Sequence, residues 1–355
     1  MIKYIGSKRR LVPVLAAIAA ASGARRALDL FTGTTRVAQA FKSQQMTVTA
    51  VDSARYAEVF ARCYIEADAE SVDARALHEA IAYLDARGGR PGYFTETFCV
   101  QSRFFQPFNG ERIDAIRGAV ESEFRASPLY PILLTSLIEA ADRVDSTTGL
   151  QMAYVKQWSP RSFAPLRLRV PELLAGRGTA IRADACEVSP GLGHFDLAYL
   201  DPPYNQHRYF TNYHVWETLV AWDAPEHYGI ACKRLDARED HTKSAFNSKR
   251  TMAPALAALV RDVSCELLVL SYNDESWLSL DQLVEMCGQH EAVRVLGFPS
   301  ARYVGARIGI HNPAGVKVGT VSHLENLEYL VMAGERRTVA RAIAAVQGTG
   351  LRPTG

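Results

Sequence analysis

The alternation of short apolar segments with helical ones near the start of the chain most constrains its fold. Residues 26–30 and 47–51 have the apolar composition of buried strands, whereas residues 36–42 and 54–67 have the spacing of helices. Strand–helix–strand–helix order is typical of a parallel, doubly wound sheet that carries helices on both faces. The sequence therefore predicts an α/β fold.

A long helical stretch interrupts this alternation. Residues 71–177 have mostly helical periodicity, and five strand-like segments follow, at 179–183, 195–200, 267–272, 293–298 and 327–332. We predict a doubly wound, mostly parallel, seven-stranded sheet built from residues 1–70 and 178–347. Residues 71–177 are then an inserted, mainly helical domain, and residues 348–355 are a flexible tail. A glycine-rich, hairpin-like stretch at 303–321 precedes the last strand, which we expect to be antiparallel and at the edge of the sheet.

Charge and cysteine content restrict the class of protein only loosely. The chain has 40 basic and 38 acidic residues, a balance that neither requires nor excludes a polyanionic partner. Six dispersed cysteines without a Cys-x-x-Cys pair indicate reduced thiols, a cytoplasmic protein and no metal centre. Residues 11–21 resemble the core of a secretory signal, but we interpret them as a helix of the mature protein. No apolar run approaches the roughly 20 residues that span a bilayer, so no membrane partner is expected.

Two turns carry the chemistry. The first strand ends in Asp-Leu-Phe-Thr-Gly-Thr at residues 29–34, and the strand at 195–200 ends in Asp-Pro-Pro-Tyr at residues 201–204. Ligands of doubly wound sheets bind at the carboxyl ends of strands where the winding direction reverses, so both turns should converge on one crevice. Asp52, which ends the second strand, can accept hydrogen bonds from ribose hydroxyls. Thr35 and Ala38 stand where a dinucleotide-binding turn needs glycine, which favours S-adenosylmethionine, a ligand that has no pyrophosphate.

The second turn suits the activation of an amine. The carboxylate of Asp201 and the backbone carbonyl of Pro202 can accept both hydrogens of an adenine or cytosine amine, whose lone pair is otherwise delocalised into the ring. The two prolines fix the backbone, and Tyr204 offers a flat face on which a base can stack. We therefore predict Asp201, Pro202 and Tyr204 as the catalytic residues. Attack by a cysteine is disfavoured, because none of the cysteines adjoins a proline.

Three motifs resemble those of the Dam-like class of adenine-N6 DNA methyltransferases. Lys-Tyr-Ile-Gly-Ser-Lys at residues 3–8 is similar to the family's Lys-Trp-x-Gly-Gly-Lys, and residues 29–34 are similar to its Asp-Leu-Phe-x-Gly-x-Gly turn. Residues 201–204 match its catalytic motif at all four positions. The resemblance implies S-adenosylmethionine as the cofactor. It implies the following cofactor contacts: Tyr4, Lys8, Asp29, Phe31, Gly33, Thr34, Asp52, Asp184 and Asp201. Tyr4 in place of tryptophan and Thr35 in place of the second glycine depart from the family pattern.

The same resemblance assigns target recognition to the inserted domain. Six basic residues and one acidic residue lie between positions 156 and 182. The predicted DNA-binding residues are Arg103, Lys156, Arg161, His207 and Arg208. Phe104, Phe105 and Trp158 are candidate base contacts, and the polar and aromatic residues 205–209 and 213–214 suit closure over a flipped base. Double-stranded DNA is thus the expected partner, and no obligate protein partner is evident.

The sequence therefore predicts site-specific transfer of a methyl group from S-adenosylmethionine to N6 of adenine in double-stranded DNA. Transfer would be direct and in line, onto a flipped base, as in restriction–modification systems. Methylation of N4 of cytosine, of RNA or of a protein glutamine uses the same amine chemistry, and a non-catalytic DNA-binding protein could retain the fold. Aspartate as the first residue of the catalytic motif, together with the N-terminal lysine motif, favours adenine in DNA.

Overall fold

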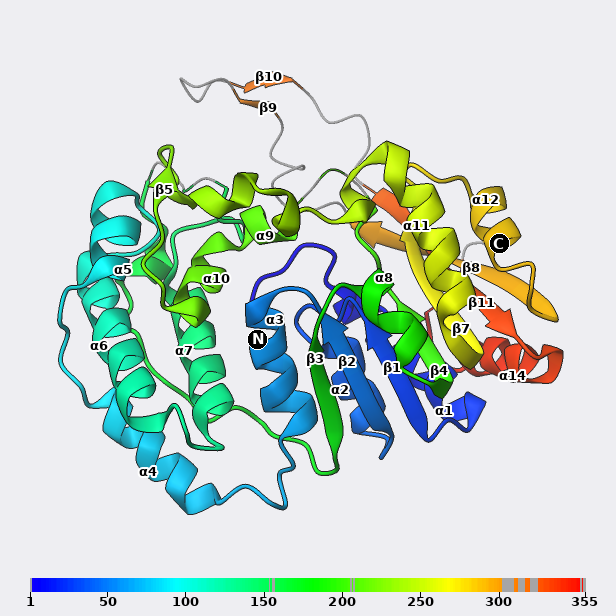
Figure 1. Ribbon diagram of the computed structural model, residues 1–355, viewed down its shortest axis with the longest axis horizontal. Coiled ribbons are helices and arrows are strands. Elements are labelled where there is room, and N and C mark those ends of the chain that lie inside the picture. Colours follow the sequence, from blue (N-terminus) through cyan, green and yellow to red (C-terminus); the bar gives the residue numbers. More distant parts are fainter. Residues whose placement is uncertain are drawn as a thin grey trace.

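A seven-stranded sheet forms the centre of the computed structural model, with the strand order β3-β2-β1-β4-β7-β11-β8 (Figure 1). The structure describes residues 2–152, 154, 157–204, 206, 208–301, 310–311, 317–319, 325–351 and 353. The strands are β1 (Arg26–Leu30), β2 (Thr47–Asp52), β3 (Gly178–Arg182), β4 (His194–Leu200), β7 (Ser264–Asn273), β8 (Ala292–Ala301) and β11 (Glu325–Gly334). Strands β3, β2, β1, β4 and β7 pair in parallel, and the winding reverses between β1 and β4. The predicted fold class is confirmed.

The last strand occupies a different slot from the one predicted. β11 is antiparallel, as expected, but it lies between β7 and β8 and pairs with both, so the edge strand is β8. The connection from β7 to β8 skips one strand position in the sheet, and β11, which follows β8 in the chain, occupies that position. Strand β11 thereby pairs on both sides and is buried over most of its described length. Most of the hairpin-like stretch at 303–321 lies outside the described residues. Within it, β9 (Ile310–His311) pairs antiparallel with β10 (Lys317–Gly319).

Helices cover both faces of the sheet. Helices α1 (Val12–Ser22), α2 (Arg36–Lys42), α3 (Arg55–Ala61) and α14 (Arg336–Gln347) share one hydrophobic core. Helices α8 (Ala185–Val188), α11 (Lys249–Asp262) and α12 (Leu280–Met286) share a second core on the opposite face. The run that resembles a secretory signal is thus the buried helix α1. Within the described ranges, no helix is both long enough and apolar enough to cross a membrane.

The helix that was predicted over residues 54–67 ends at a buried lysine, Lys42, which bonds its last carbonyls. The helix is α-helical only as α3 and continues as a π-helical segment, Arg62–Glu66. The Lys42 ammonium donates to the backbone carbonyls of Tyr64, Ile65 and Ala67 at 3.2, 2.9 and 2.6 Å. These carbonyls are at the helix end, where intrahelical donors are lacking, so the lysine satisfies them from a distant part of the chain.

The helical insertion is joined to the sheet by a continuous core. It contains α4 (Ala74–Asp85), α5 (Tyr93–Thr95), α6 (Pro107–Phe124) and α7 (Tyr130–Val144), which lie at the left of Figure 1. Its buried side chains belong to the same hydrophobic cluster as those of α1, α2 and α3. Two helices that follow the catalytic strand, α9 (Tyr209–Asn212) and α10 (His214–Ala221), lie between the insertion and the sheet. The domain boundaries at 71 and 178 therefore stay a prediction, because packing does not divide the molecule there.

Arg117 fastens α10 to the insertion. Its side chain is 1% exposed and donates to the carbonyls of Leu219 and Val220 at 2.8 and 3.0 Å. It also pairs with Glu121 at 2.8 Å. These carbonyls end α10 and have no further turn of helix to donate to them, so the guanidinium provides their hydrogen bonds.

Replacement of Arg117 tests this connection. We expect Arg117→Met to lower the free energy of unfolding by about 3 kcal/mol, because buried carbonyls lose their donor. Arg125 contacts the same Glu121 but is exposed, so Arg125→Met should lower it by less than about 0.5 kcal/mol. Urea unfolding measures both changes. Equal losses would mean that Arg117 contributes no more than a surface ion pair.

Candidate active site

Three distant segments line one pocket at the carboxyl ends of β1 and β4. The pocket is partly open to solvent, and about 330 Å³ of space free of protein atoms, open solvent included, lies between its walls. Its lining residues come from the N-terminal motif, the turn after β1 and the end of β4: Tyr4, Gly6, Ser7, Lys8, Asp29, Phe31, Thr32, Gly33, Thr34, Arg36, Val37, Tyr199 and Asp201. The structure thus brings together the two turns that the sequence placed in one crevice.

The turn after β1 has an unusual backbone. Phe31, Gly33 and Thr35 have φ values of 67°, 50° and 61°, all in the left-handed region. This region is costly for Phe31 and for the β-branched Thr35, which stands at the family's second glycine. The carboxylate of Asp29 supports the turn by accepting from the Thr32 hydroxyl at 2.8 Å and from the Ala38 amide at 3.1 Å.

Asp29 is almost completely buried, with 1% exposure. Burial raises the pKa of Asp29 to about 7, although the Thr32 hydrogen bond opposes this shift and the nearby Asp201 carboxylate adds to it. A cation in the pocket would favour the ionised form of Asp29, because opposite charges stabilise each other most strongly where water is excluded.

Asp52, at the end of β2, holds the same turn from the other side. Its carboxylate accepts from the Gly33 and Ala54 amides, each at 2.9 Å. Burial raises its pKa, and the backbone hydrogen bonds oppose this increase. A carboxylate has about four acceptor positions, so Asp52 can still accept hydrogen bonds from ribose hydroxyls.

Tyr4 lies directly over Gly33. A Cβ atom on Gly33 would lie 2.9 Å from Cε1 of Tyr4, closer than a side chain tolerates. The Tyr4 ring stacks on Tyr213 with a centroid distance of 4.6 Å, and its hydroxyl is 3.1 Å from that of Tyr56. Only glycine permits this approach of ring and backbone, so the two motifs form one continuous cradle.

Lys8 is the one buried cation described at the pocket wall. Its ammonium is 2.8 Å from Oδ1 of Asp201 and 2.8 Å from Oε1 of Glu328. Burial disfavours the ammonium, but these two carboxylates outweigh that effect and hold the pKa of Lys8 well above its ordinary value. The family resemblance implied a cofactor contact for Lys8. In the structure, the Lys8 ammonium contacts Asp201 of the catalytic turn.

Glu328 was missed by the sequence analysis. It lies inside the strand predicted at 327–332, and its side chain is buried. A charged residue within an otherwise apolar strand was the available signal, because buried carboxylates need a partner.

The rest of the catalytic turn follows directly after β4. Pro202 is buried, whereas Asp201 and Tyr204 are partly exposed. The Tyr204 ring packs edge-on against Tyr272 with a centroid distance of 5.9 Å. Burial raises the pKa of Asp201 above its ordinary value; Lys8 opposes this shift and Glu328 adds to it.

Asp184, like Asp52, is a cofactor candidate that is not among the residues lining this pocket. It follows β3, two strands away from β1, and its carboxylate accepts from the Cys186 amide at 2.8 Å as the N-cap of α8. It does not line the pocket. Its predicted contact with the cofactor adenine stays a prediction.

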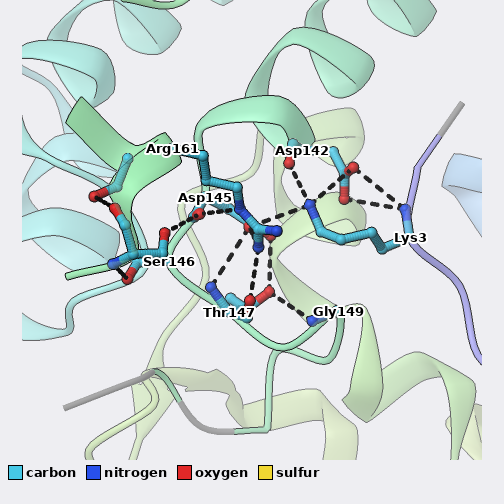
Figure 2. Close-up of polar contacts among 9 residues, drawn as sticks. Lys3, Asp142, Asp145, Ser146, Thr147, Gly149 and Arg161 are labelled. Atoms are coloured by element: carbon cyan, nitrogen blue, oxygen red, sulfur yellow. Dashed lines mark hydrogen bonds and ion pairs between the residues drawn. The ribbon is translucent and has the colours of Figure 1, made fainter. Parts of the chain in front are cut away.

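The predicted DNA contacts have different surroundings. Arg161 donates to the carbonyls of Asp145 and Thr147 at 2.7 and 2.6 Å and pairs with the Asp145 carboxylate. Lys3 contacts the same carboxylate, so Figure 2 shows the N-terminal segment and Arg161 meeting on one loop. Arg103 stacks on the Trp158 ring at 4.7 Å, and Arg208 donates to the Ala237 carbonyl at 3.3 Å. Lys156 and His207 lie outside the described residues.

Several aromatic candidates are in the core. Phe104 and Phe105 are 0% and 1% exposed and pack among other buried rings, so the prediction that they contact bases is wrong. Tyr213 and His214 are likewise fully buried. The Nε2 atom of His214 is 2.9 Å from the Gln151 carbonyl. Because this ring is buried and hydrogen-bonded, it cannot close over a base.

Fold and site together define a class of protein. The pocket combines carboxylates that suit a cation with a turn of left-handed backbone. Asp52, an acid of the kind that binds ribose hydroxyls, holds the Gly33 amide of that turn. These features fit S-adenosylmethionine, which carries a sulfonium and a ribose. With the Asp-Pro-Pro-Tyr turn on the same pocket, they define a cofactor-dependent methyltransferase that acts on an amine.

Comparison with known proteins identifies the family. The pattern of the D12 class N6 adenine-specific DNA methyltransferases matches residues 4–286. Type II methyltransferase M.NlaIII of Neisseria lactamica is 30% identical over 268 residues, 73% of this chain and 78% of that protein. Modification methylase StsI of Streptococcus sanguinis is 29% identical over 80% of this chain, which spans 46% of its length. Type II methyltransferase M.FokI of Planomicrobium okeanokoites is 25% identical over 85% of this chain and 49% of its own length.

The chain therefore belongs to the D12 class N6 adenine-specific DNA methyltransferases. It is an enzyme that uses S-adenosylmethionine to methylate N6 of adenine in DNA. This finding decides among the amine targets that the sequence had left open.

Substitution of Gly33 tests the cradle. Gly33→Ala adds a methyl group at positive φ and within 2.9 Å of Tyr4, so we expect affinity for S-adenosylmethionine to fall at least about tenfold in calorimetry. Gly193 has a φ of 80° with nothing within 4 Å of its Cβ position. Gly193→Ala therefore carries the same backbone strain without the contact and should bind normally. Equal loss in both variants would assign the effect to stability.

Asp29 should make stability depend on pH. Its pKa of about 7 in the folded protein exceeds the unfolded value, so the folded state binds the extra proton between about pH 4 and pH 7. The contribution of Asp29 to the free energy of unfolding is therefore fully present below about pH 4 and is lost as the pH rises through 7. Relative to Asp29→Asn, the wild-type protein without cofactor should lose up to about 4 kcal/mol over this window in urea unfolding. A constant difference would show that Asp29 is ionised throughout.

Proposed function

We propose that Asp201 and the carbonyl of Pro202 accept the two hydrogens of the adenine amine, while Tyr204 stacks on the base. One observation carries this proposal: Asp201 and Gly33 line the same pocket. An acceptor of the target amine therefore faces the turn that holds the cofactor. Two hydrogen bonds to the amine draw its nitrogen towards tetrahedral geometry and free the lone pair for transfer.

The residues around Asp201 prepare it for this role. Lys8 stabilises the ionised carboxylate, which can accept hydrogen bonds but cannot donate one. Buried Pro202 and its neighbour restrict the backbone, so the carbonyl is held in place before the substrate arrives. S-adenosylmethionine, when bound, supplies the methyl group. The proton that the nitrogen then loses can pass to Asp201, the nearest predicted base.

The substrate proposed for this site is double-stranded DNA. An adenine amine inside a duplex is paired, so the base must rotate out at a cost of a few kcal/mol. The helical insertion would recognise the target, with Arg103 and Trp158 as a stacked pair that can meet backbone or base. Arg161 would act through the loop 145–149, which it holds.

The biological role that best fits is the modification activity of a type II restriction–modification system. The relatives M.NlaIII, StsI and M.FokI carry the names of such methyltransferases. We place the protein in the cytoplasm with the DNA it modifies, and its six free cysteines suit a reducing compartment.

Asp201→Asn is the test of this site. The amide keeps the shape but replaces one acceptor with a donor that repels the amine, so methyl transfer should fall at least about 1,000-fold while the cofactor still binds. The measurement is mapping of N6-methyladenine at single-base resolution in a mixed-sequence duplex library.

The matched control is Asp196→Asn. Asp196 lies on β4, which Asp201 directly follows, but its carboxylate accepts from the Arg25 and Arg26 amides and does not line the pocket. It should leave methyl transfer unchanged. Activity retained by Asp201→Asn would remove the proposed role, and methylation confined to single-stranded DNA would remove the proposed substrate.

A further inference from the structure

Glu328 is buried in the middle of the sheet beside the catalytic turn. Its side chain is 7% exposed and comes from β11, between β7 and β8. It accepts a hydrogen bond from the Ser271 hydroxyl on β7 at 2.7 Å. A buried carboxylate is retained only where hydrogen bonds and charge compensate for its lost hydration. Ser271 supplies the first of these, and Lys8 supplies the second.

Lys8 is shared equally between two carboxylates. Its ammonium is 2.8 Å from Asp201 and 2.8 Å from Glu328. Two buried carboxylates with one cation leave an excess negative charge at the wall where the amine is received. A carboxylate that holds the cation alone is a weaker acceptor for other donors, because the cation draws its electron density.

We propose that Glu328 is a positioning residue for methyl transfer: it takes part of the charge of Lys8, so that the Asp201 carboxylate remains a strong hydrogen-bond acceptor for the adenine amine. This proposal rests on the proposed role of Asp201. It gives a use to a buried carboxylate that lies outside the three motifs of the family resemblance.

The charged and titratable groups that face this pair come from every neighbouring element. Lys8 lies on the N-terminal segment, Asp29 on β1, Tyr199 on β4, Tyr204 on the catalytic turn and Tyr209 on α9. Tyrosines are neutral at physiological pH, and burial raises the pKa of Tyr199, Tyr204 and Tyr209 further. The Asp29 and Asp201 carboxylates also act on each other, and Glu275 acts on Tyr204. Lys8 and Glu328 are the charged groups that act most strongly on Asp201.

Glu328→Gln removes one negative charge at nearly constant shape. With that charge gone, Lys8 pairs with Asp201 alone, and ionisation of Asp201 becomes easier. The acid limb of the pH profile of kcat/KM should therefore move to lower pH, by about one unit. At pH 8, where Asp201 is ionised in both proteins, kcat should fall about tenfold because the amine meets a weaker acceptor.

Two variants separate this effect from a structural one. Glu328→Asp keeps the charge, so its acid limb should lie within about 0.3 pH units of the wild-type position. Ser271→Ala removes the hydrogen bond to Glu328 without changing any charge; it should lower thermal stability and leave the acid limb in place. A merely structural role would give all three variants lower stability and the same pH profile.

A readout without turnover completes the test. The carboxyl carbon of Asp201, labelled with ¹³C and assigned through Asp201→Asn, reports ionisation in the protein without cofactor. Its titration should move to lower pH in Glu328→Gln. If Glu328→Gln does not fold, the comparison is made in the Lys8→Met background, in which Lys8 cannot be left as a buried cation with too few partners. The single variant Lys8→Met is then compared with the double variant Lys8→Met, Glu328→Gln. The second protein should again titrate at lower pH.

The outcomes are distinct. An unchanged or raised titration of Asp201 after loss of Glu328, in either background, would overturn the inference. Full activity of Asp201→Asn would instead overturn the proposed function, and the inference with it. An inactive Asp201→Asn together with an unchanged acid limb in Glu328→Gln would leave the function intact and remove only the role of Glu328.

Discussion

The buried ammonium of Lys8 is the interaction on which the site depends. It joins the N-terminal motif to the end of β4 through Asp201 and to β11 through Glu328, each at 2.8 Å. Burial disfavours the charged form of a lysine, and the two carboxylates outweigh that effect at Lys8. Removal of Lys8 would leave two carboxylates without their cation, so the segments that carry the three groups are held together electrostatically as well as by packing.

The cofactor turn depends on a second close approach. Tyr4 covers Gly33, while Asp29 and Asp52 hold the turn from two sides. The two departures from the family pattern become intelligible here. Thr35 takes the left-handed conformation in which the family has glycine, and Tyr4 retains an aromatic face that stacks on Tyr213. The chain thus preserves the shape of the turn with other residues, at the cost of backbone strain.

The helical insertion is coupled to the catalytic part by polar anchors within a shared core. Arg117 holds the end of α10, and Lys3 and Arg161 meet on the carboxylate of Asp145. Arg161 therefore organises the loop that a recognition surface would use. Composition marked residues 156–182 as basic, but it could not distinguish an arginine that supports a loop from one that faces DNA, because both are equally hydrophilic in sequence.

The sequence by itself determined the limits of β1 and α2, the class of the sheet and the convergence of residues 29–34 with residues 201–204. These follow from local apolar periodicity and from the rule that parallel strands end at one edge. Only the tertiary structure placed β11 between β7 and β8, brought Glu328 to Lys8 and buried Phe104. Each of these depends on contacts between residues far apart in the chain, which no local pattern records, since the same strand or ring is compatible with several neighbours until packing selects one.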